Sequence, residues 1–154
     1  MFLDPAAELY EPARRAIVEA DIIVICPGDL YSSLVPTLLT KGMKEAIQKS
    51  KARTVWVCNT MTKWGETNDF TASDFARELT RYSGIHIFDY IIWNTKSIAE
   101  EVREQYARER KYPVQLDEDE LQEYATEIKK ADLLSRTDLV RFDSQKVARI
   151  LAEL

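Results

Sequence analysis

Three polar segments each follow a short apolar run in this sequence. Residues 21–26 (DIIVIC) lead into PGDLYSS, residues 54–59 (TVWVCN) lead into TMTKWGET, and residues 90–94 (YIIWN) lead into TKS. Their hydroxyl, amide and carboxylate groups suit the phosphates and the ribose or sugar hydroxyls of a nucleotide-type ligand. We therefore expect a ligand site built from these segments. Its candidate residues are Pro27, Gly28, Asp29, Leu30, Tyr31, Ser32, Ser33, Asn59, Thr62, Glu66, Thr67, Asp74 and Asn94.

The PGDLYSS segment has the order of a strand end, a tight turn and a helix start. Pro27 and Gly28 end the strand and let the chain turn. Asp29, Ser32 and Ser33 then provide short polar side chains where a helix can begin. Exposed N–H groups at such a position attract phosphate. The segment is therefore the predicted phosphate-binding loop.

The role of Asp29 stays open at this point. A carboxylate beside a phosphate is repelled unless it caps a helix, binds a hydroxyl group or holds a divalent cation. An N-cap is as compatible with the sequence as a ligand contact. Mg²⁺, held by Asp29, is thus the one cofactor that the sequence leaves possible.

Several common kinds of site are not indicated. The sequence contains no GxGxxG, GxxxxGK[ST] or HExxH motif, which argues against a conventional dinucleotide site, a P-loop and a zinc protease. The single histidine, His86, lies in an apolar context and is interpreted as structural. Cys26 and Cys58 lack metal-ligand spacing and are interpreted as small apolar residues with reduced thiols.

Length and charge limit the class of protein. The 154 residues are enough for one ordinary domain. A formal charge of −5 argues against a broad nucleic-acid or anionic-membrane surface. The apolar runs are shorter than the roughly 20 residues that a membrane span requires. With no signal peptide and two reduced thiols, the sequence predicts a cytoplasmic protein.

The predicted elements place the three polar segments at one sheet edge. Each step between the strands includes a helix, which is the alternation of a doubly wound α/β fold with a parallel sheet. Helical segments are predicted within residues 8–20, 34–50, 71–82, 98–110 and 117–130, and in a final helix that Asp143 caps. Thr71 and Asp74 fit a capping box. An extended piece is expected at 112–116 and a short edge strand at 131–134.

Four separated motifs, in this order, resemble the carboxyl-terminal half of the CofD/YvcK superfamily: EADIIVICPGDLYSSLVP, VCNTMTKWGETNDFTASDFARELTRY, DYIIWNTKS and RFDSQKVARILAEL. That superfamily contains 2-phospho-L-lactate transferases and bacterial gluconeogenesis factors. The resemblance implies a Rossmann-like, three-layer parallel sheet with a helical carboxyl-terminal part. We expect residues 1–154 to be a single domain of this type. The glycine-rich strand, turn and helix that open the family are not recognisable, so a truncated or split domain is expected.

Two positions depart from the family pattern. The usual Gly-Pro-Gly of the central loop is Cys26-Pro27-Gly28 here, and the usual Gln-Pro of the long loop is Lys63-Trp64. The second departure falls where the resemblance implies the lip of the ligand site.

The PGDLYSS loop is most similar to the gluconeogenesis-factor branch. That resemblance implies binding of a UDP-sugar, such as UDP-N-acetylglucosamine, and regulation of carbon metabolism, cell-wall synthesis and cell shape. It also implies nucleotide contacts from Tyr106 and Arg141. A first alternative is a transferase acting on a deazaflavin acceptor, with Asp29 or Glu66 positioning a metal. A second is a fragment that acts through a partner chain, either as a homo-oligomer or paired with the missing amino-terminal half.

Overall fold

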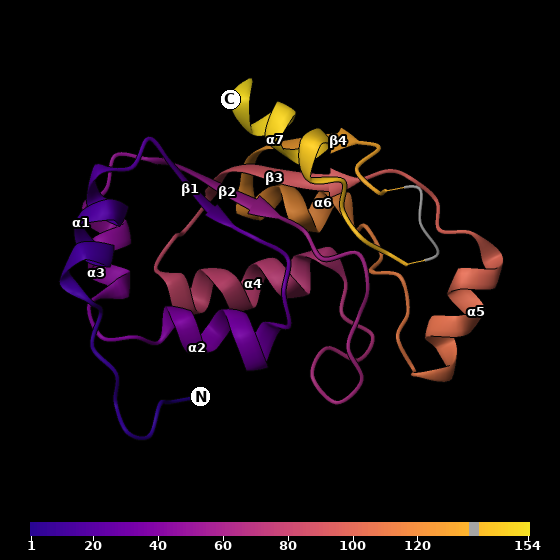
Figure 1. Cartoon of the computed structure of the whole chain (residues 1–154), viewed down its shortest axis with the longest axis horizontal. Helices are drawn as coiled ribbons and strands as arrows, with labels where there is room; N and C mark the ends of the chain where they lie inside the picture. The colour runs from indigo at the N-terminus through magenta and orange to yellow at the C-terminus, as the bar shows by residue number, and fades with distance from the viewer. Residues whose placement is uncertain (136–138) are drawn as a thin grey trace.

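The computed structural model describes residues 1–135 and 139–154. Four strands form one sheet, β1 (Ile22–Ile25), β2 (Arg53–Val57), β3 (Phe88–Asn94) and β4 (Ala125–Ala131), in that spatial order and all parallel. Because every strand points the same way, their carboxyl ends share one edge (Figure 1). This confirms the predicted parallel α/β sheet.

Helices cover both faces of the sheet and produce three layers. Figure 1 shows α2 (Val35–Leu38) and α4 (Ala72–Ser83) below the sheet and α7 (Ser144–Ala152) above it. Helices α1 (Glu11–Glu19) and α3 (Met43–Lys49) pack together beside β1. The Rossmann-like architecture expected from the sequence is therefore present.

Side-chain alternation along β2 divides the core into two clusters. Trp56 points toward the helical face that carries α4, where its ring lies 6.4 Å from Phe75 and 6.2 Å from Phe88. Val55 and Val57 point to the opposite face, which α7 covers. Successive side chains of a strand alternate between faces, so a strand buried on both sides is apolar throughout. The apolar runs from which the strands were predicted are therefore explained by burial of both faces of the sheet.

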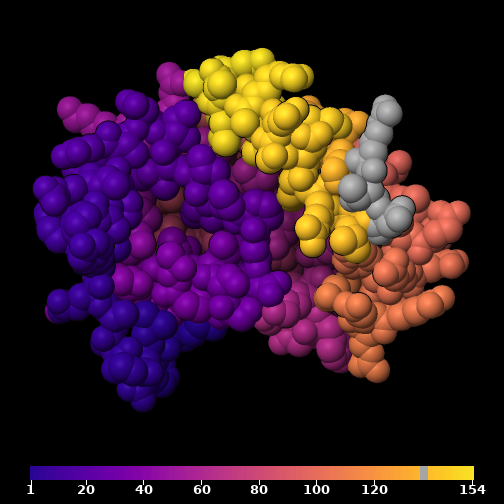
Figure 2. All heavy atoms as spheres, in the orientation of Figure 1, coloured from indigo at the N-terminus to yellow at the C-terminus, as the bar shows by residue number. Residues whose placement is uncertain are grey.

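The carboxyl-terminal helix joins distant parts of the chain. Its Val147 and Leu151 pack in the same cluster as Ile22 and Val24 of β1. Figure 2 shows the carboxyl-terminal segment lying against the early part of the chain at the surface. Asp143 begins the helix as predicted, because its carboxylate accepts hydrogen bonds from the N–H groups of two residues in the first turn.

Helix α4 also begins and ends as predicted. The Thr71 N–H donates to the Asp74 carboxylate at 3.0 Å, which is the reciprocal half of a capping box. Gly84 follows the helix with a φ of +76°, a conformation that costs glycine less than other residues. These local signals depend on neighbouring residues only, which is why the sequence was sufficient to predict them.

The prediction of a charged helical stretch at 117–130 was wrong. The structure has a short helix α6 (Glu118–Leu121), a 3₁₀ turn (Gln122–Tyr124) and then strand β4. Strand β4 is a sheet edge, and edge strands carry charged residues that oppose unwanted pairing. Its mixed charges therefore resemble those of a solvated helix face. The edge strand predicted at 131–134 was also misplaced, because β4 ends at Ala131.

Two further features position the site. After Asp29 the chain forms a π-helical turn (Leu30–Leu34) that runs directly into α2. Helix α5 (Glu100–Arg108) projects beyond the carboxyl ends of the strands (Figure 1).

Cys58 is buried as expected, whereas Cys26 is exposed. Within the described ranges, no helix combines the length and apolar character that crossing a membrane would require.

Candidate functional site

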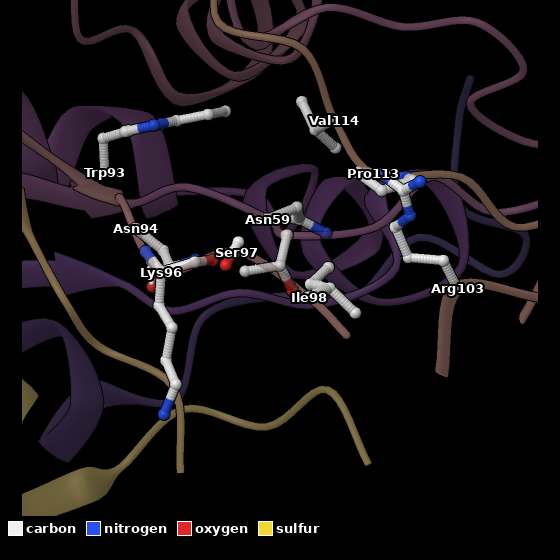
Figure 3. Close-up of a pocket in the computed structure, with 10 residues that line it drawn as sticks. Asn59, Trp93, Asn94, Lys96, Ser97, Ile98, Arg103, Pro113 and Val114 are labelled. Atoms are coloured by element: carbon white, nitrogen blue, oxygen red, sulfur yellow. Dashed lines mark hydrogen bonds between the residues drawn. The ribbon is translucent and has the colours of Figure 1, made fainter. Parts of the chain in front are cut away.

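Two neighbouring cavities lie at the carboxyl edge of the sheet. The first, which we call the β3 cavity, measures about 230 Å³, and the second, the loop cavity, about 300 Å³. The β3 cavity is lined by Asn59, Thr60, Trp93, Asn94, Lys96, Ser97, Ile98, Arg103, Pro113 and Val114 (Figure 3). The loop cavity is lined by Asp29, Leu30, Asn59, Met61, Thr62, Lys63, Thr67 and Lys111. They share Asn59, so together they form one candidate ligand site.

Asn59 connects the ends of two strands. It follows β2 directly, and its Nδ2 donates a 2.7 Å hydrogen bond to the carbonyl oxygen of Gly28, just after β1. Its Oδ1 is buried and accepts no hydrogen bond from the described residues. The side chain thus fixes the turn after β1 and lines both cavities.

The predicted phosphate-binding loop already holds an anion from the protein itself. The Glu66 carboxylate accepts hydrogen bonds from the N–H of Tyr31 at 3.0 Å, the N–H of Ser32 at 3.3 Å and the Ser32 hydroxyl at 2.7 Å. Burial would raise the pKa of Glu66, but hydrogen bonds from Lys63, Ser32 and Tyr31 outweigh it and lower that pKa. The N–H groups expected to meet a phosphate therefore bind a carboxylate.

Lys63 completes this cluster at the mouth of the loop cavity. Its ammonium lies 2.5 Å from Asp29 Oδ2, 2.9 Å from Glu66 Oε1 and 3.3 Å from Ser32 Oγ. These hydrogen bonds, first to Asp29 and then to Glu66, raise the pKa of Lys63. Asp29 stands at the N-cap position but accepts no capping hydrogen bond there. Its carboxylate is paired with an ammonium instead.

The residues of this cluster do not fit Mg²⁺. A magnesium ion needs open carboxylate oxygens in near-octahedral geometry. Here the facing oxygens of Asp29 and Glu66 already bind the Lys63 ammonium. No group of three or more His, Cys, Asp or Glu side chains suited to a metal occurs in the described part of the chain.

The structure brings together part of the predicted site. Asp29, Leu30, Asn59, Thr62 and Thr67 line the loop cavity, and Asn94 lines the β3 cavity. Pro27, Gly28 and Glu66 lie in the adjoining loops, and Tyr31, Ser32 and Ser33 lie in the π-helical turn. Several of these side chains have structural partners.

Three of the polar side chains hold the walls of the site. The Thr62 hydroxyl accepts the N–H of Tyr112 at 3.0 Å, and the Thr67 hydroxyl accepts the N–H of Lys63 at 2.9 Å. Asn94 Oδ1 accepts the N–H of Lys96 at 3.2 Å and that of Leu133 at 3.1 Å. These contacts position the loops, so a ligand would meet the surfaces they create.

The remaining predicted residues lie further out. Asp74 caps α4 and pairs with Arg77 at 2.6 Å. Tyr106 lines a separate hollow of about 190 Å³, and its hydroxyl accepts the N–H of Val140 at 3.3 Å. Arg141 follows Val140, so the fold brings its segment against Tyr106. Arg141 is not among the residues that line these three hollows.

The site residues that come from α5 and from the segment after it were not predicted from the sequence. Arg103 and Pro113 lie at one end of the β3 cavity, and Trp93 lies at the other end (Figure 3). The extended segment reaches the sheet edge through a 3.0 Å hydrogen bond from the Val114 N–H to the Thr60 carbonyl. The sequence did predict an extended segment at 112–116, but it did not indicate which part of the sheet that segment contacts.

Comparisons with known proteins agree with this architecture. The family model described as "2-phospho-L-lactate transferase CofD" matches residues 1–134. A Bacillus subtilis protein named gluconeogenesis factor is 35% identical over 99% of this chain and 47% of its own length. Another gluconeogenesis factor, from Halalkalibacterium halodurans, is 40% identical over 90% of this chain and 44% of its own length.

A solved structure supports the same assignment. A crystal structure of a protein from Bacillus halodurans has a TM-score of 0.89 and 36% identity, and the match covers 94% of this chain and 47% of that one. The chain spans about half the length of the curated relatives it matches. A fold of this likeness, together with a family match over most of the sequence, identifies the chain as a member of the CofD family.

Proposed function

We propose that this chain binds a nucleotide sugar, specifically a UDP-sugar, at the carboxyl edge of its sheet, and that it is a regulatory protein of the gluconeogenesis-factor type. Its roles would be the control of carbon metabolism, cell-wall synthesis and cell shape. The curated relatives quoted above carry the name gluconeogenesis factor, whereas the transferase name belongs to the family as a whole. The names therefore favour the regulator over the deazaflavin transferase.

One observation carries the proposal: the β3 cavity and the loop cavity share Asn59 and differ in chemistry. Trp93, Ile98 and Val114 give the β3 cavity an apolar wall. Lys96 and Arg103 bring positive charge to that same cavity. In the loop cavity, the ammonium groups of Lys63 and Lys111 are already paired with carboxylates. A nucleotide sugar has a flat base, a diphosphate and a hydroxyl-rich sugar, and it needs adjacent apolar and cationic surfaces.

Lys96 and Arg103, the two cations that line the β3 cavity, differ in the partners that they already contact. The Lys96 ammonium donates to the carbonyl oxygens of Leu134 and Ser135, so it is held at the cavity edge. Arg103 is exposed on α5, where its guanidinium pairs with Glu100. A guanidinium can bind two phosphate oxygens at once. Arg103 is therefore the side chain that we expect to contact the diphosphate.

The test is isothermal titration of the purified chain with UDP-N-acetylglucosamine, with GDP as the comparison ligand. Arg103→Ala is the site variant. Arg108→Ala is the matched control, because Arg108 is an exposed arginine at the end of the same helix that lines neither cavity. Tyr106→Ala and Arg141→Ala test the two contacts implied by the family resemblance.

The proposal requires selective binding of the uridine ligand. We expect Arg103→Ala to weaken that binding by at least about tenfold, as loss of one charge-assisted hydrogen bond of roughly 1.5–3 kcal/mol would. Arg108→Ala should bind like the parent chain. Equal affinity for GDP, or full binding by Arg103→Ala, would count against the site as described.

The oligomeric state belongs to the same proposal. Because the chain spans about half of its relatives' length, we propose that it works as a homo-oligomer or together with a partner that supplies the other half. Light scattering of the chain alone measures the first arrangement. Repeating the titration with a longer version of the protein would show whether added chain raises the affinity.

A further inference from the structure

The Lys63 ammonium lies between two carboxylates from different loops. It contacts Asp29 Oδ2 at 2.5 Å, Glu66 Oε1 at 2.9 Å and the Ser32 hydroxyl at 3.3 Å. Two carboxylates facing the same point repel each other unless a cation lies between them. The ammonium therefore serves as the counter-charge that lets the two loops approach.

The oxygens around Lys63 are also of the type that a divalent cation binds. Mg²⁺ in proteins takes one or two carboxylates and keeps several water molecules. Asp29 and Glu66 would provide such a pair if the ammonium were removed. While the ammonium is present, the same oxygens are occupied at hydrogen-bonding distance.

The surroundings hold Lys63 and Glu66 in place. Glu66 Oε2 accepts the N–H groups of Tyr31 and Ser32, so its carboxylate has a fixed orientation. Only 16% of the Glu66 side chain is exposed. Trp64, next to Lys63, lies under the Arg110 guanidinium, whose carbon is 4.5 Å from the ring centre. This cation–π contact anchors the loop beside the cluster.

We propose that Lys63 is a built-in cation that takes the position of a divalent metal between Asp29 and Glu66 and keeps that position closed to Mg²⁺ and Mn²⁺. A phosphate ligand then meets a cluster whose two negative charges are already compensated in part. The proposal concerns the ligand-free protein, so it can be tested whether or not a nucleotide sugar binds.

Manganese provides the probe, because it is paramagnetic and broadens the amide NMR signals of nearby residues. Nitrogen-labelled parent chain and Lys63→Gln are each titrated with MnCl₂, and the signals of Tyr31 and Ser32 are followed. Glutamine removes the charge but keeps a side chain of similar length. Lys63→Met is a second neutral variant in case glutamine disturbs the loop. Lys51→Gln, at an exposed lysine just before β2, is the matched control.

We expect the Tyr31 and Ser32 signals of Lys63→Gln to broaden at Mn²⁺ concentrations at least about tenfold lower than those of the parent chain. Excess Mg²⁺ should reverse the broadening, and adding Asp29→Asn to the variant should abolish it. Lys63→Arg, which keeps a cation, should behave like the parent. The same selective broadening in the parent chain would overturn the proposal, as would its absence in both folded neutral variants.

Discussion

The Nδ2 atom of Asn59 donates a 2.7 Å hydrogen bond to the carbonyl oxygen of Gly28. The bond crosses from the end of β2 to the turn after β1, and it lies where the two site cavities meet. A single amide group thus links the packing of the sheet edge to the shape of the site.

Replacing this amide by a carboxylate should destabilise the protein. Asn59→Asp substitutes an acceptor for the donor and places it against the Gly28 carbonyl oxygen. We expect a loss of roughly 1–3 kcal/mol in the free energy of unfolding at neutral pH, measured by urea denaturation. Asn68→Asp is the control, because the Asn68 Oδ1 accepts the N–H of Gly65 at 2.9 Å and a carboxylate preserves that role. Equal losses in both variants would contradict the assignment.

Glu66 should make stability depend on pH in the acid range. Although burial raises its pKa, the hydrogen bonds from Lys63, Ser32 and Tyr31 lower the pKa further than burial raises it. A carboxyl group with a lowered folded-state pKa stabilises the protein above its unfolded pKa of about 4.3, and that stabilisation is lost as pH falls through the folded value.

The comparison with Glu66→Gln measures this contribution. The parent chain should be more stable than the variant at neutral pH, and the difference should shrink as the pH drops below about 4. Glu45→Gln, at an exposed position on α3, is the control for loss of a surface carboxylate. A stability difference for Glu66→Gln that stays constant from neutral to acid pH would rule out the linkage.

Tyr31 should ionise late in an alkaline titration. Burial, followed by the hydrogen bond and the negative charge of Glu78, raises the pKa of its hydroxyl to about 12. The hydroxyl donates to Glu78 at 3.0 Å. Among the seven tyrosines, ultraviolet titration should therefore show a late step that Tyr31→Phe removes. Tyr10→Phe, at a side chain that is 74% exposed, should leave that step in place.

The carboxyl-terminal helix should depend on its cap. The Asp143 carboxylate accepts the N–H of Gln145 at 3.0 Å and that of Lys146 at 3.3 Å. Asp143→Ala should lower the free energy of unfolding by about 1 kcal/mol, and Asp143→Asn should retain most of the stability because asparagine is also a good N-cap. Urea denaturation of both variants separates the lost cap from a general effect of substitution. Equal stability of Asp143→Ala and the parent would show that the cap contributes nothing.

The features predicted correctly from the sequence are those whose cause is local. Strand β2 was recognisable because Val55 and Val57 face one cluster and Trp56 the other, which makes the run apolar throughout. The capping of α4 by Thr71 and of α7 by Asp143 depends on residues within one turn. Each of these signals lies within a few positions of the structure it determines.

Strand β4 could not be predicted because its sequence resembles a solvated helix. Glu127 and Lys129 lie two residues apart and form an ion pair of 2.6 Å along the strand. Mixed charges of this kind also occur on helix surfaces. Only pairing with β3, from Phe88↔Ala125 to Asn94↔Ala131, makes the segment a strand.

In the candidate site too, the residues with a local cause were predicted and those that depend on long-range contacts were not. Asn59 and Asn94 were predicted because parallel strands bring their carboxyl ends together. The binding of Glu66 to the Tyr31 and Ser32 N–H groups joins positions more than 30 residues apart, so no local pattern reveals it. Arg103 enters the site from a helix that the sequence predicts but cannot orient.

The two edge strands of the sheet, β1 and β4, differ in how strongly they oppose pairing with an additional strand. Strand β4 carries Glu127, Lys129 and Lys130, whereas β1 reads IIVI and has no charged side chain. An apolar groove of about 200 Å³ lies beside β1, lined by its own residues and by α2 and α3. Since charges on a margin oppose the addition of a strand, an incoming segment of polypeptide meets less opposition at β1 than at β4.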